Sequence, residues 1–220
     1  MESKKTTVYF IPGMAAGPEI FDHIQLPEDQ YTIEILEWMI PKKEESLKDY
    51  AQRMANRVTA PNPILIGVSF GGIVAQEMEA FLDLRKLIII SSVKVRKELP
   101  KRMKIAGSTK LYKLIPTSLV LSAEDLTKFS VGPKTKKRLK LYQKYLHVRD
   151  ERYLDWSIKN IVTWDRKEAV PGIVHIQGDK DPVFPIKYIK DCLVIPNGTH
   201  IMILNRASEI SKLLLQVFKE

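Results

Sequence analysis

Residues 64–72 read Ile64-Leu65-Ile66-Gly67-Val68-Ser69-Phe70-Gly71-Gly72, and this stretch decides the fold of the chain. Its apolar beginning has the length of a buried strand, and residues 73–78 after it read as a helix. Ser69 therefore lies in a tight turn between strand and helix, where the glycines remove Cβ atoms that would collide. The serine hydroxyl is expected to project from this turn, beside the unpaired N–H groups that open the helix.

The pattern Gly-x-Ser-x-Gly alone also fits a glycine-rich loop that happens to contain a serine, so later residues must decide. A strand-like run over 173–176 leads into a loop with Asp181 three residues after Gly178. A second run over 193–195 leads into a loop that carries His200. Asp179 is a rival carboxylate in the first loop. The order serine, aspartate, histidine, each after a predicted strand, differs from the orders of chymotrypsin and subtilisin.

With these three segments the chain resembles the α/β-hydrolase family. The resemblance implies Ser69 as nucleophile, His200 as general base and Asp181 as the carboxylate that holds the imidazole, because the family's acid falls three residues after the glycine. It also implies an oxyanion hole formed by the backbone N–H groups of Met14 and Phe70. The family's first loop usually reads His-Gly-x, whereas Pro12 stands here in the place of the histidine.

The fold expected is α/β, an α/β-hydrolase fold with about six mainly parallel strands flanked by helices. Strands are predicted near residues 8–11, 31–38, 64–67, 87–90, 172–176 and 192–195. The resemblance implies that the first and third are neighbours, because the family's strand order places them so. Residues 1–92 and 170–220 would form the core. Residues 93–169 would form a helical cap, inserted after the fourth strand, with one helix from Pro133 and one from about Asp150.

Charge is unevenly distributed along the chain. The net charge is +9, and the segment from Val93 to Glu168 holds 20 lysines and arginines against 8 acidic residues. This excess favours an anionic substrate, although lysines on solvated helix faces are the commoner explanation. A nucleic-acid or other anionic-partner binding module is the alternative from another class. Lysines outnumber arginines in the segment and no nucleic-acid motif is present, so no nucleic-acid partner is expected.

The composition, 45% hydrophobic and 28% charged, is that of one globular domain. No secretory or membrane-spanning run appears, and Cys192 is the single cysteine. We therefore expect a cytoplasmic protein without a membrane partner. No cofactor and no metal are expected, because the histidines are scattered and the glycine loops lack the phosphate and dinucleotide patterns.

Other reactive side chains receive no catalytic role. His175 lies inside an apolar run and is expected to be a buried core residue, while His23 and His147 fall on predicted helices. Cys192 has no activating neighbour and is expected to be inert. Trp164 and Asp165 either line a pocket or pack, and packing is favoured.

The sequence thus predicts a serine hydrolase that cleaves an ester or thioester of a small acyl substrate through an acyl-enzyme on Ser69. Since the family also contains C–C bond hydrolases and lyases, those reactions are the alternative within the same fold. A fold whose catalytic activity has been lost is a third possibility, which the substitution at Pro12 leaves open.

Overall fold

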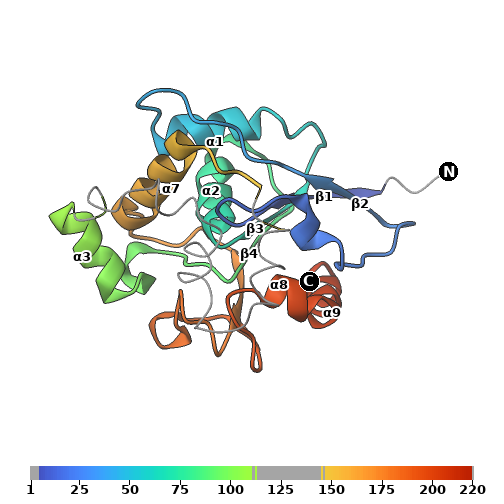
Figure 1. The fold of residues 1–220 in the computed structure, drawn as a ribbon. Coiled ribbons are helices and arrows are strands. Elements are labelled where there is room, and N and C mark those ends of the chain that lie inside the picture. Colours follow the sequence, from blue (N-terminus) through green and yellow to red (C-terminus); the bar gives the residue numbers. More distant parts are fainter. Residues whose placement is uncertain (1–4, 111, 113–144, 146, 220) are drawn as a thin grey trace.

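Six parallel strands form a single sheet in the computed structural model, which describes residues 5–110, 112, 145 and 147–219 (Figure 1). The spatial order is β2-β1-β3-β4-β5-β6. The strands are β1 (Thr6–Ile11), β2 (Tyr31–Ile35), β3 (Ile64–Val68), β4 (Lys86–Ile90), β5 (Val174–Gly178) and β6 (Leu193–Ile195). The predicted α/β fold and the predicted neighbours β1 and β3 are confirmed. Because all strands run the same way, the loops after β1, β3, β4, β5 and β6 gather at one edge.

Helices cover both faces of this sheet (Figure 1). On one side lie α1 and α2, which contact each other, and α7, which contacts α2; on the other side lie η1, α8 and α9. The α-helices are α1 (Leu47–Ala55), α2 (Phe70–Met78), α3 (Lys101–Thr109), α7 (Glu151–Thr163), α8 (Met202–Asn205) and α9 (Ala207–Val217). Short 3₁₀ helices are η1 (Pro18–Phe21), η2 (Glu79–Phe81), η3 (Arg96–Glu98) and η5 (Ile186–Tyr188).

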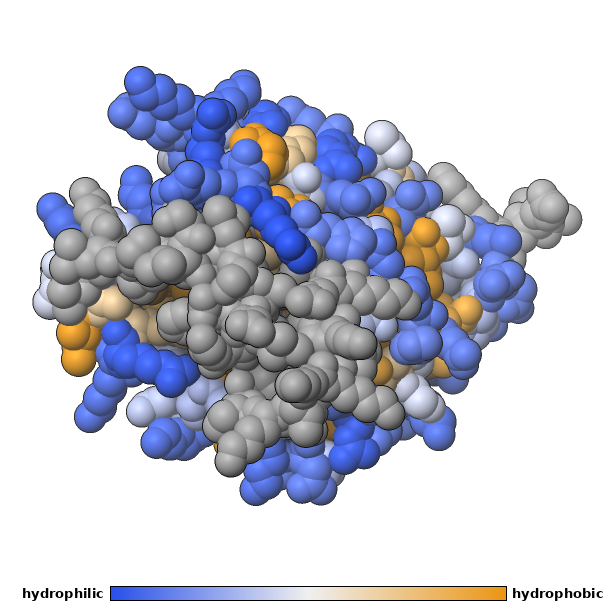
Figure 2. Space-filling model, viewed as in Figure 1, coloured by the Kyte–Doolittle hydropathy of each residue, from blue (hydrophilic) through white to orange (hydrophobic). Residues whose placement is uncertain are grey.

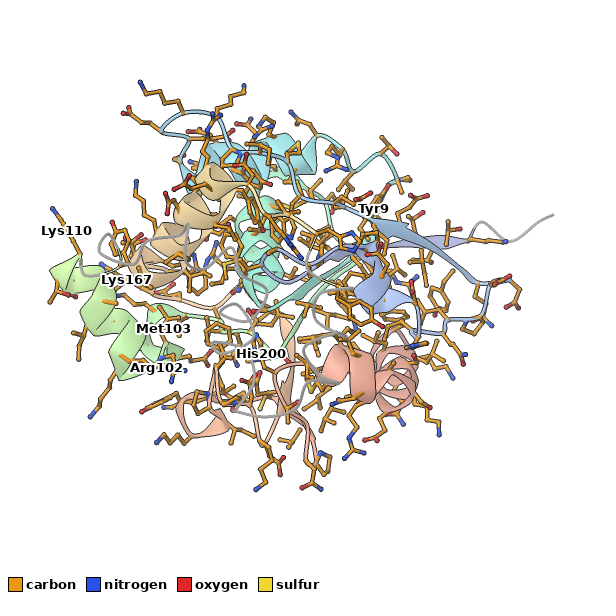
Figure 3. All side chains as sticks on the ribbon, in the orientation of Figure 1. Tyr9, Arg102, Met103, Lys110, Lys167 and His200 are labelled. Carbon is orange, nitrogen blue, oxygen red and sulfur yellow. The ribbon has the colours of Figure 1, made fainter. Side chains whose placement is uncertain are left out.

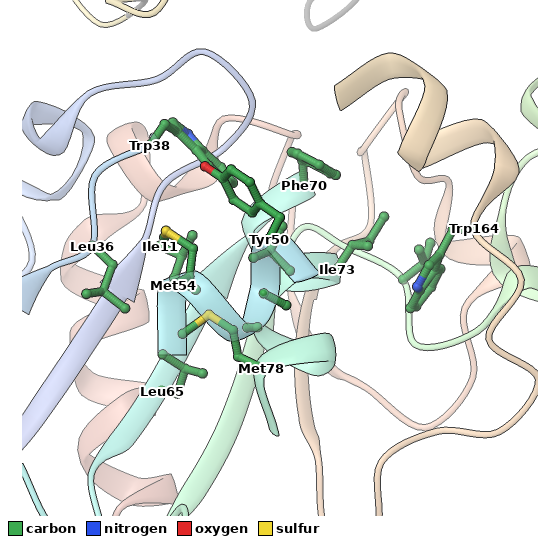
Figure 4. Close-up of a cluster of buried hydrophobic side chains, with 14 of the residues drawn as sticks. Ile11, Leu36, Trp38, Tyr50, Met54, Leu65, Phe70, Ile73, Met78 and Trp164 are labelled. Carbon is green, nitrogen blue, oxygen red and sulfur yellow. The ribbon is translucent and has the colours of Figure 1, made fainter. Parts of the chain in front are cut away.

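Alternation along the strands sends side chains into two separate cores. In β1, Val8 and Phe10 join the core under α8 and α9, whereas Tyr9 and Ile11 join the core under α1 and α2. Figure 4 shows the second core, where Ile11 and Leu65 from the sheet lie near Met54 and Met78 from the helices. A sheet buried on both faces explains why its strands read as nearly continuous apolar runs.

Two helices begin at the capping residues that the sequence suggests. The Ser46 hydroxyl accepts a hydrogen bond from Asp49 N–H at 3.1 Å and donates one to the Asp49 carboxylate at 2.6 Å at the start of α1. Asp150 accepts from Tyr153 N–H at 2.9 Å at the start of α7. Each cap satisfies an N–H group that has no partner inside its helix.

The structure corrects some local predictions. The strand expected over 31–38 ends at Ile35, and the chain then turns so that Trp38 enters the core. His23 lies in a turn rather than a helix, and His147 lies in an irregular segment. The backbone N–H of His147 donates to Ala15 O at 2.9 Å, so it bonds to the loop after β1 and not to a helix.

Only parts of the segment predicted as a cap belong to the described residues. The helix expected from Pro133 lies outside them, except for Tyr145. The described parts include α3 and α7, which contact each other at one end of the molecule (Figure 1). The boundary of a cap at 93–169 therefore stays a prediction.

The surface is mostly polar where Figure 2 shows described residues, and apolar side chains appear there only in small separate areas. Among the described residues, the large hydrophobic side chains that are more than a third exposed are Ile33, Ile40, Ile105, Leu193 and Val194. Across the described ranges, every helix is too short or too polar to cross a bilayer.

Candidate active site

Ser69 occupies the turn between β3 and α2 in a strained backbone conformation, with φ 54° and ψ −118°. Such a conformation costs about 1–3 kcal/mol and persists only where the surroundings hold it. Here Ser69 N–H donates to Ile90 O at 2.9 Å, and the Ser92 hydroxyl donates to Ser69 O at 2.7 Å. Gly71 is required beside it, because a Cβ there would collide with the Pro12 carbonyl.

The loops after β5 and β6 bring an aspartate and a histidine to this serine. Ser69 Oγ lies 2.9 Å from His200 Nε2, and His200 Nδ1 lies 2.9 Å from Asp181 Oδ2. The two loops pack so closely that a Cβ on Gly178 would collide with the backbone of Gly198. The structure therefore assembles one hydrogen-bonded chain from three segments that are far apart in sequence.

The Asp181 carboxylate is fully buried and uses both oxygens. Oδ1 accepts from the N–H groups of Val183 at 2.7 Å and Phe184 at 2.9 Å. Oδ2 accepts from Gln177 Nε2 at 3.0 Å as well as facing His200. These donors fix the position of the carboxylate, which can orient an imidazole and stabilise its protonated form. The rival Asp179 makes no side-chain contact with His200, and its buried Oδ1 lacks a hydrogen-bond partner within the described ranges.

Gln177 connects Asp181 to a second histidine that the sequence treats as a core residue. Its amide Nε2 also donates to Phe184 O at 2.8 Å, and its Oε1 lies 3.1 Å from His175 Nε2. Burial lowers the pKa of His175 to about 4, so this ring is neutral at pH 7. His175 is thus a buried residue, as predicted, but one that belongs to the polar network behind the site.

The two backbone N–H groups predicted as oxyanion donors lie on opposite sides of Ser69 in sequence and come from different loops. Phe70 is the first residue of α2, so its N–H has no acceptor inside the helix. Met14 follows Gly13, where a Cβ would lie 3.6 Å from Ser69 Cβ. In the described part of the chain Met14 N–H donates to no acceptor. Both groups are therefore available to a charged oxygen.

A cavity of about 380 Å³ opens over Ser69 and His200. Side chains from α3, α7, η1, α8 and the loops line it, and most are apolar: Met14, Ile20, Met103, Ala106, Ile158, Ile161, Val162, Val183, Phe184, Ile201, Ile203 and Leu204. Arg102 contributes a positive charge at the exposed side of this lining, and it donates to Pro182 O at 2.9 Å. Figure 3 shows Arg102 and Met103 on α3, with His200 toward the middle of the molecule.

The remaining candidates lie away from this cavity. Trp164 is buried and donates to the Glu77 carboxylate at 3.0 Å, so it packs, while Asp165 is exposed. Burial raises the pKa of the Cys192 thiol, which agrees with an unreactive cysteine. In the part of the chain that the structure describes, no three His, Cys, Asp or Glu side chains gather as metal ligands would.

The backbones of known structures are similar to this fold over almost the whole chain. A hydrolase from Pseudomonas aeruginosa PA01 is similar with a TM-score of 0.72 and 14% identity, over 98% of this chain and 91% of that one. A lipase-esterase related protein from Clostridium acetobutylicum has a TM-score of 0.67 and 15% sequence identity, over 99% of this chain and 96% of that one. BioG from Haemophilus influenzae has a TM-score of 0.61 and 15% sequence identity, over 90% of each chain.

The chain has the α/β-hydrolase fold. No family model matches its sequence, and no curated protein is significantly similar to it in sequence. The resemblance named from a few motifs is therefore confirmed at the level of fold, by the path of the backbone. In this chain a serine, a histidine and an aspartate are hydrogen-bonded to one another at the edge of the sheet where the strands end.

Sequence reasoning did not single out several residues that shape this site, namely Trp38, Ser92, Tyr153 and Gln177. Ser92 and Trp38 come shortly after strands β4 and β2, and a search for polar or aromatic residues at strand ends would have found them. Tyr153 and Gln177 carry no such signal, because a helix residue and a strand residue reach the site only through tertiary packing.

Proposed function

We propose that the protein is a serine hydrolase that cleaves esters or thioesters of small apolar acyl groups. The hydrogen-bonded chain Asp181–His200–Ser69, which ends at an apolar cavity, is the observation that carries this proposal. A hydroxyl bonded to a ring nitrogen whose other nitrogen faces a buried carboxylate is an activated nucleophile.

In the first half of the proposed reaction, Ser69 Oγ attacks the acyl carbonyl while its proton passes to His200 Nε2. The negative charge on the tetrahedral oxygen is stabilised by the N–H groups of Met14 and Phe70. The carbonyl reforms as the alcohol or thiol leaves with the proton from His200. In the second half, water attacks the acyl-enzyme and gives a proton to His200, which returns it to Ser69 as the acid departs.

The cavity supports an apolar acyl group as the part of the substrate that is bound there. Helices α3 and α7 contribute Met103, Ile158 and Ile161 to the cavity lining. This supports the proposal that residues 93–169 act as a cap over the site. Arg102 in the same lining supports a substrate with a negative group outside the acyl pocket, since no carboxylate within the described ranges pairs with it.

A panel of p-nitrophenyl esters and acyl-CoA thioesters tests the proposed function. We expect turnover of acyl groups of several carbons, loss of at least about 10³-fold in kcat for Ser69→Ala, and labelling of the native protein alone by a fluorophosphonate. An Arg102→Gln variant that loses activity toward an anionic thioester, but keeps it toward a neutral ester, would support the anionic group. A protein that shows neither turnover nor labelling would contradict the proposed function.

The location is also a proposal. We propose a cytoplasmic location, because a single cysteine fits a reducing compartment. Fractionation of cells that express the protein from its own promoter tests this, and recovery in the membrane or secreted fraction would contradict it.

A further inference from the structure

One indole ring contacts both loops that supply the proposed oxyanion donors. Trp38 Nε1 donates to Gly13 O at 2.9 Å, and the ring stacks on Phe70 with centroids 5.4 Å apart and planes 20° apart. Trp38 is only 9% exposed, and Figure 4 shows it beside Tyr50 and Phe70 at the end of the core. This residue comes from the segment after β2 and acts from behind the cavity, whose lining it does not join.

The hydrogen bond to Gly13 O fixes the direction of the Met14 N–H. The carbonyl of Gly13 and the N–H of Met14 belong to one planar peptide unit, and in a trans peptide they point in opposite directions. No cis peptide occurs among the described residues. Since Trp38 Nε1 and Ala16 N–H both donate to Gly13 O, at 2.9 and 3.0 Å, they fix the plane of this peptide, and Met14 N–H points away from these two donors.

Other bonds hold the rest of this loop. Ala15 has a left-handed conformation with φ 63°, which a residue with a side chain adopts only under constraint. Its N–H donates to the Tyr153 hydroxyl at 3.3 Å, and its carbonyl accepts from His147 N–H at 2.9 Å and Val148 N–H at 3.1 Å. None of these bonds uses the Met14 N–H, which has no acceptor among the described residues.

We propose that Trp38 is a positioning residue for oxyanion stabilisation: its indole N–H orients the Gly13–Met14 peptide, and its ring supports Phe70. The inference rests on the proposed function, because it concerns how the same site stabilises the tetrahedral intermediate. Preorganised donors help the transition state more than the ground state, so losing their orientation should lower kcat with little change in KM.

The chain offers a matched control in Trp156. Its ring also contacts Phe70, with centroids 5.8 Å apart, and it is similarly buried at 8% exposure. Its Nε1 donates to Glu45 O at 2.7 Å, which lies outside the loop after β1. Trp156→Phe therefore removes an equivalent indole hydrogen bond from the same aromatic cluster without touching the Gly13 carbonyl.

The experiment compares Trp38→Phe, Trp156→Phe and the native protein with p-nitrophenyl butyrate and with a trifluoromethyl ketone inhibitor, which forms a tetrahedral adduct. Active sites are counted with a fluorophosphonate, so that kcat refers to folded protein only. For Trp38→Phe we expect kcat to fall about 10-fold with KM nearly constant, and inhibitor binding to weaken by about the same factor. For Trp156→Phe we expect kcat and inhibitor affinity to stay within about twofold of the native values, because the Trp156 hydrogen bond does not reach the oxyanion loop.

If Trp38→Phe does not fold, 3-benzothienylalanine at position 38 makes the same test, because it keeps the ring shape and replaces the N–H by sulfur. Equal losses in the Trp38 and Trp156 variants, or an unchanged kcat in the Trp38 variants of an active enzyme, would overturn the positioning role and leave the proposed function intact. An inactive native protein would instead overturn the proposed function, and the inference with it.

Discussion

At the scale of single residues, two aspartates in one loop differ sharply in their surroundings. Asp181 is buried and faces His200, whereas Asp179 is partly exposed and makes no side-chain contact with that ring. We expect Asp181→Asn to lower kcat by about 10³–10⁴-fold with KM little changed, because the neutral amide no longer stabilises the imidazolium. Steady-state kinetics with a p-nitrophenyl ester measure this effect.

Asp179→Asn is the matched control for that substitution, since it makes the same chemical change two residues away. We expect its kcat to stay within about threefold of the native value, because no hydrogen bond to the histidine is lost. If Asp179→Asn proved the more damaging of the two, the assignment of the carboxylate to Asp181 would be wrong.

At the scale of elements, the contact between α3 and α7 depends on a residue without a side chain. A Cβ on Gly107 in α3 would collide with the backbone carbonyl of Val162 in α7. In an isolated helix alanine is favoured over glycine by about 1 kcal/mol, yet here we expect Gly107→Ala to destabilise the protein by separating the two helices. It should also reduce kcat/KM for butyrate more than for acetate, because both helices line the acyl cavity.

Ser108→Ala serves as the control in the same helix, since Ser108 is exposed and its hydroxyl donates to Lys104 O within α3. Thermal unfolding and kinetics of the two variants provide the measurement. A Gly107→Ala protein as stable as the native one would show that α3 does not need its close approach to α7.

At the scale of the whole molecule, one buried histidine makes stability depend on pH. Burial lowers the pKa of His175 to about 4, against 6.5 for an exposed ring. Between those two values the unfolded chain binds a proton that the folded chain does not, so stability falls as the pH decreases from about 6.5 to about 4. Below that range both states are protonated and this contribution stops changing.

From pH 7 to pH 5 we expect His175 to reduce the free energy of unfolding by about 2 kcal/mol. Urea unfolding of the native protein and of His175→Gln at the two pH values measures the difference. The glutamine can still donate to Gln177 and does not titrate, so the variant should show a smaller loss. Equal losses in both proteins would mean that other groups cause the pH dependence.

The arrangement of strands and helices could be predicted largely from local patterns. Apolar runs and their spacing predicted all six strands, and the helix expected from about Asp150 is α7. The end of β2 was placed wrongly, because the residues to Trp38 keep a strand-like pattern although the sheet ladder stops at Ile35. His147 was placed in a helix because its neighbours have helical spacing, whereas its backbone pairs with Ala15.

The sequence by itself determined where the turn of Ser69 lies, the order of the three reactive side chains and the α/β class, because sterics and periodicity act between near neighbours. The tertiary structure alone decided that Gln177 links Asp181 to His175, that Trp38 bonds to the Gly13 carbonyl, and that α3 and α7 enclose an apolar cavity. Those contacts join loops from different strands. Their geometry depends on how helices pack on the sheet, which local patterns do not encode.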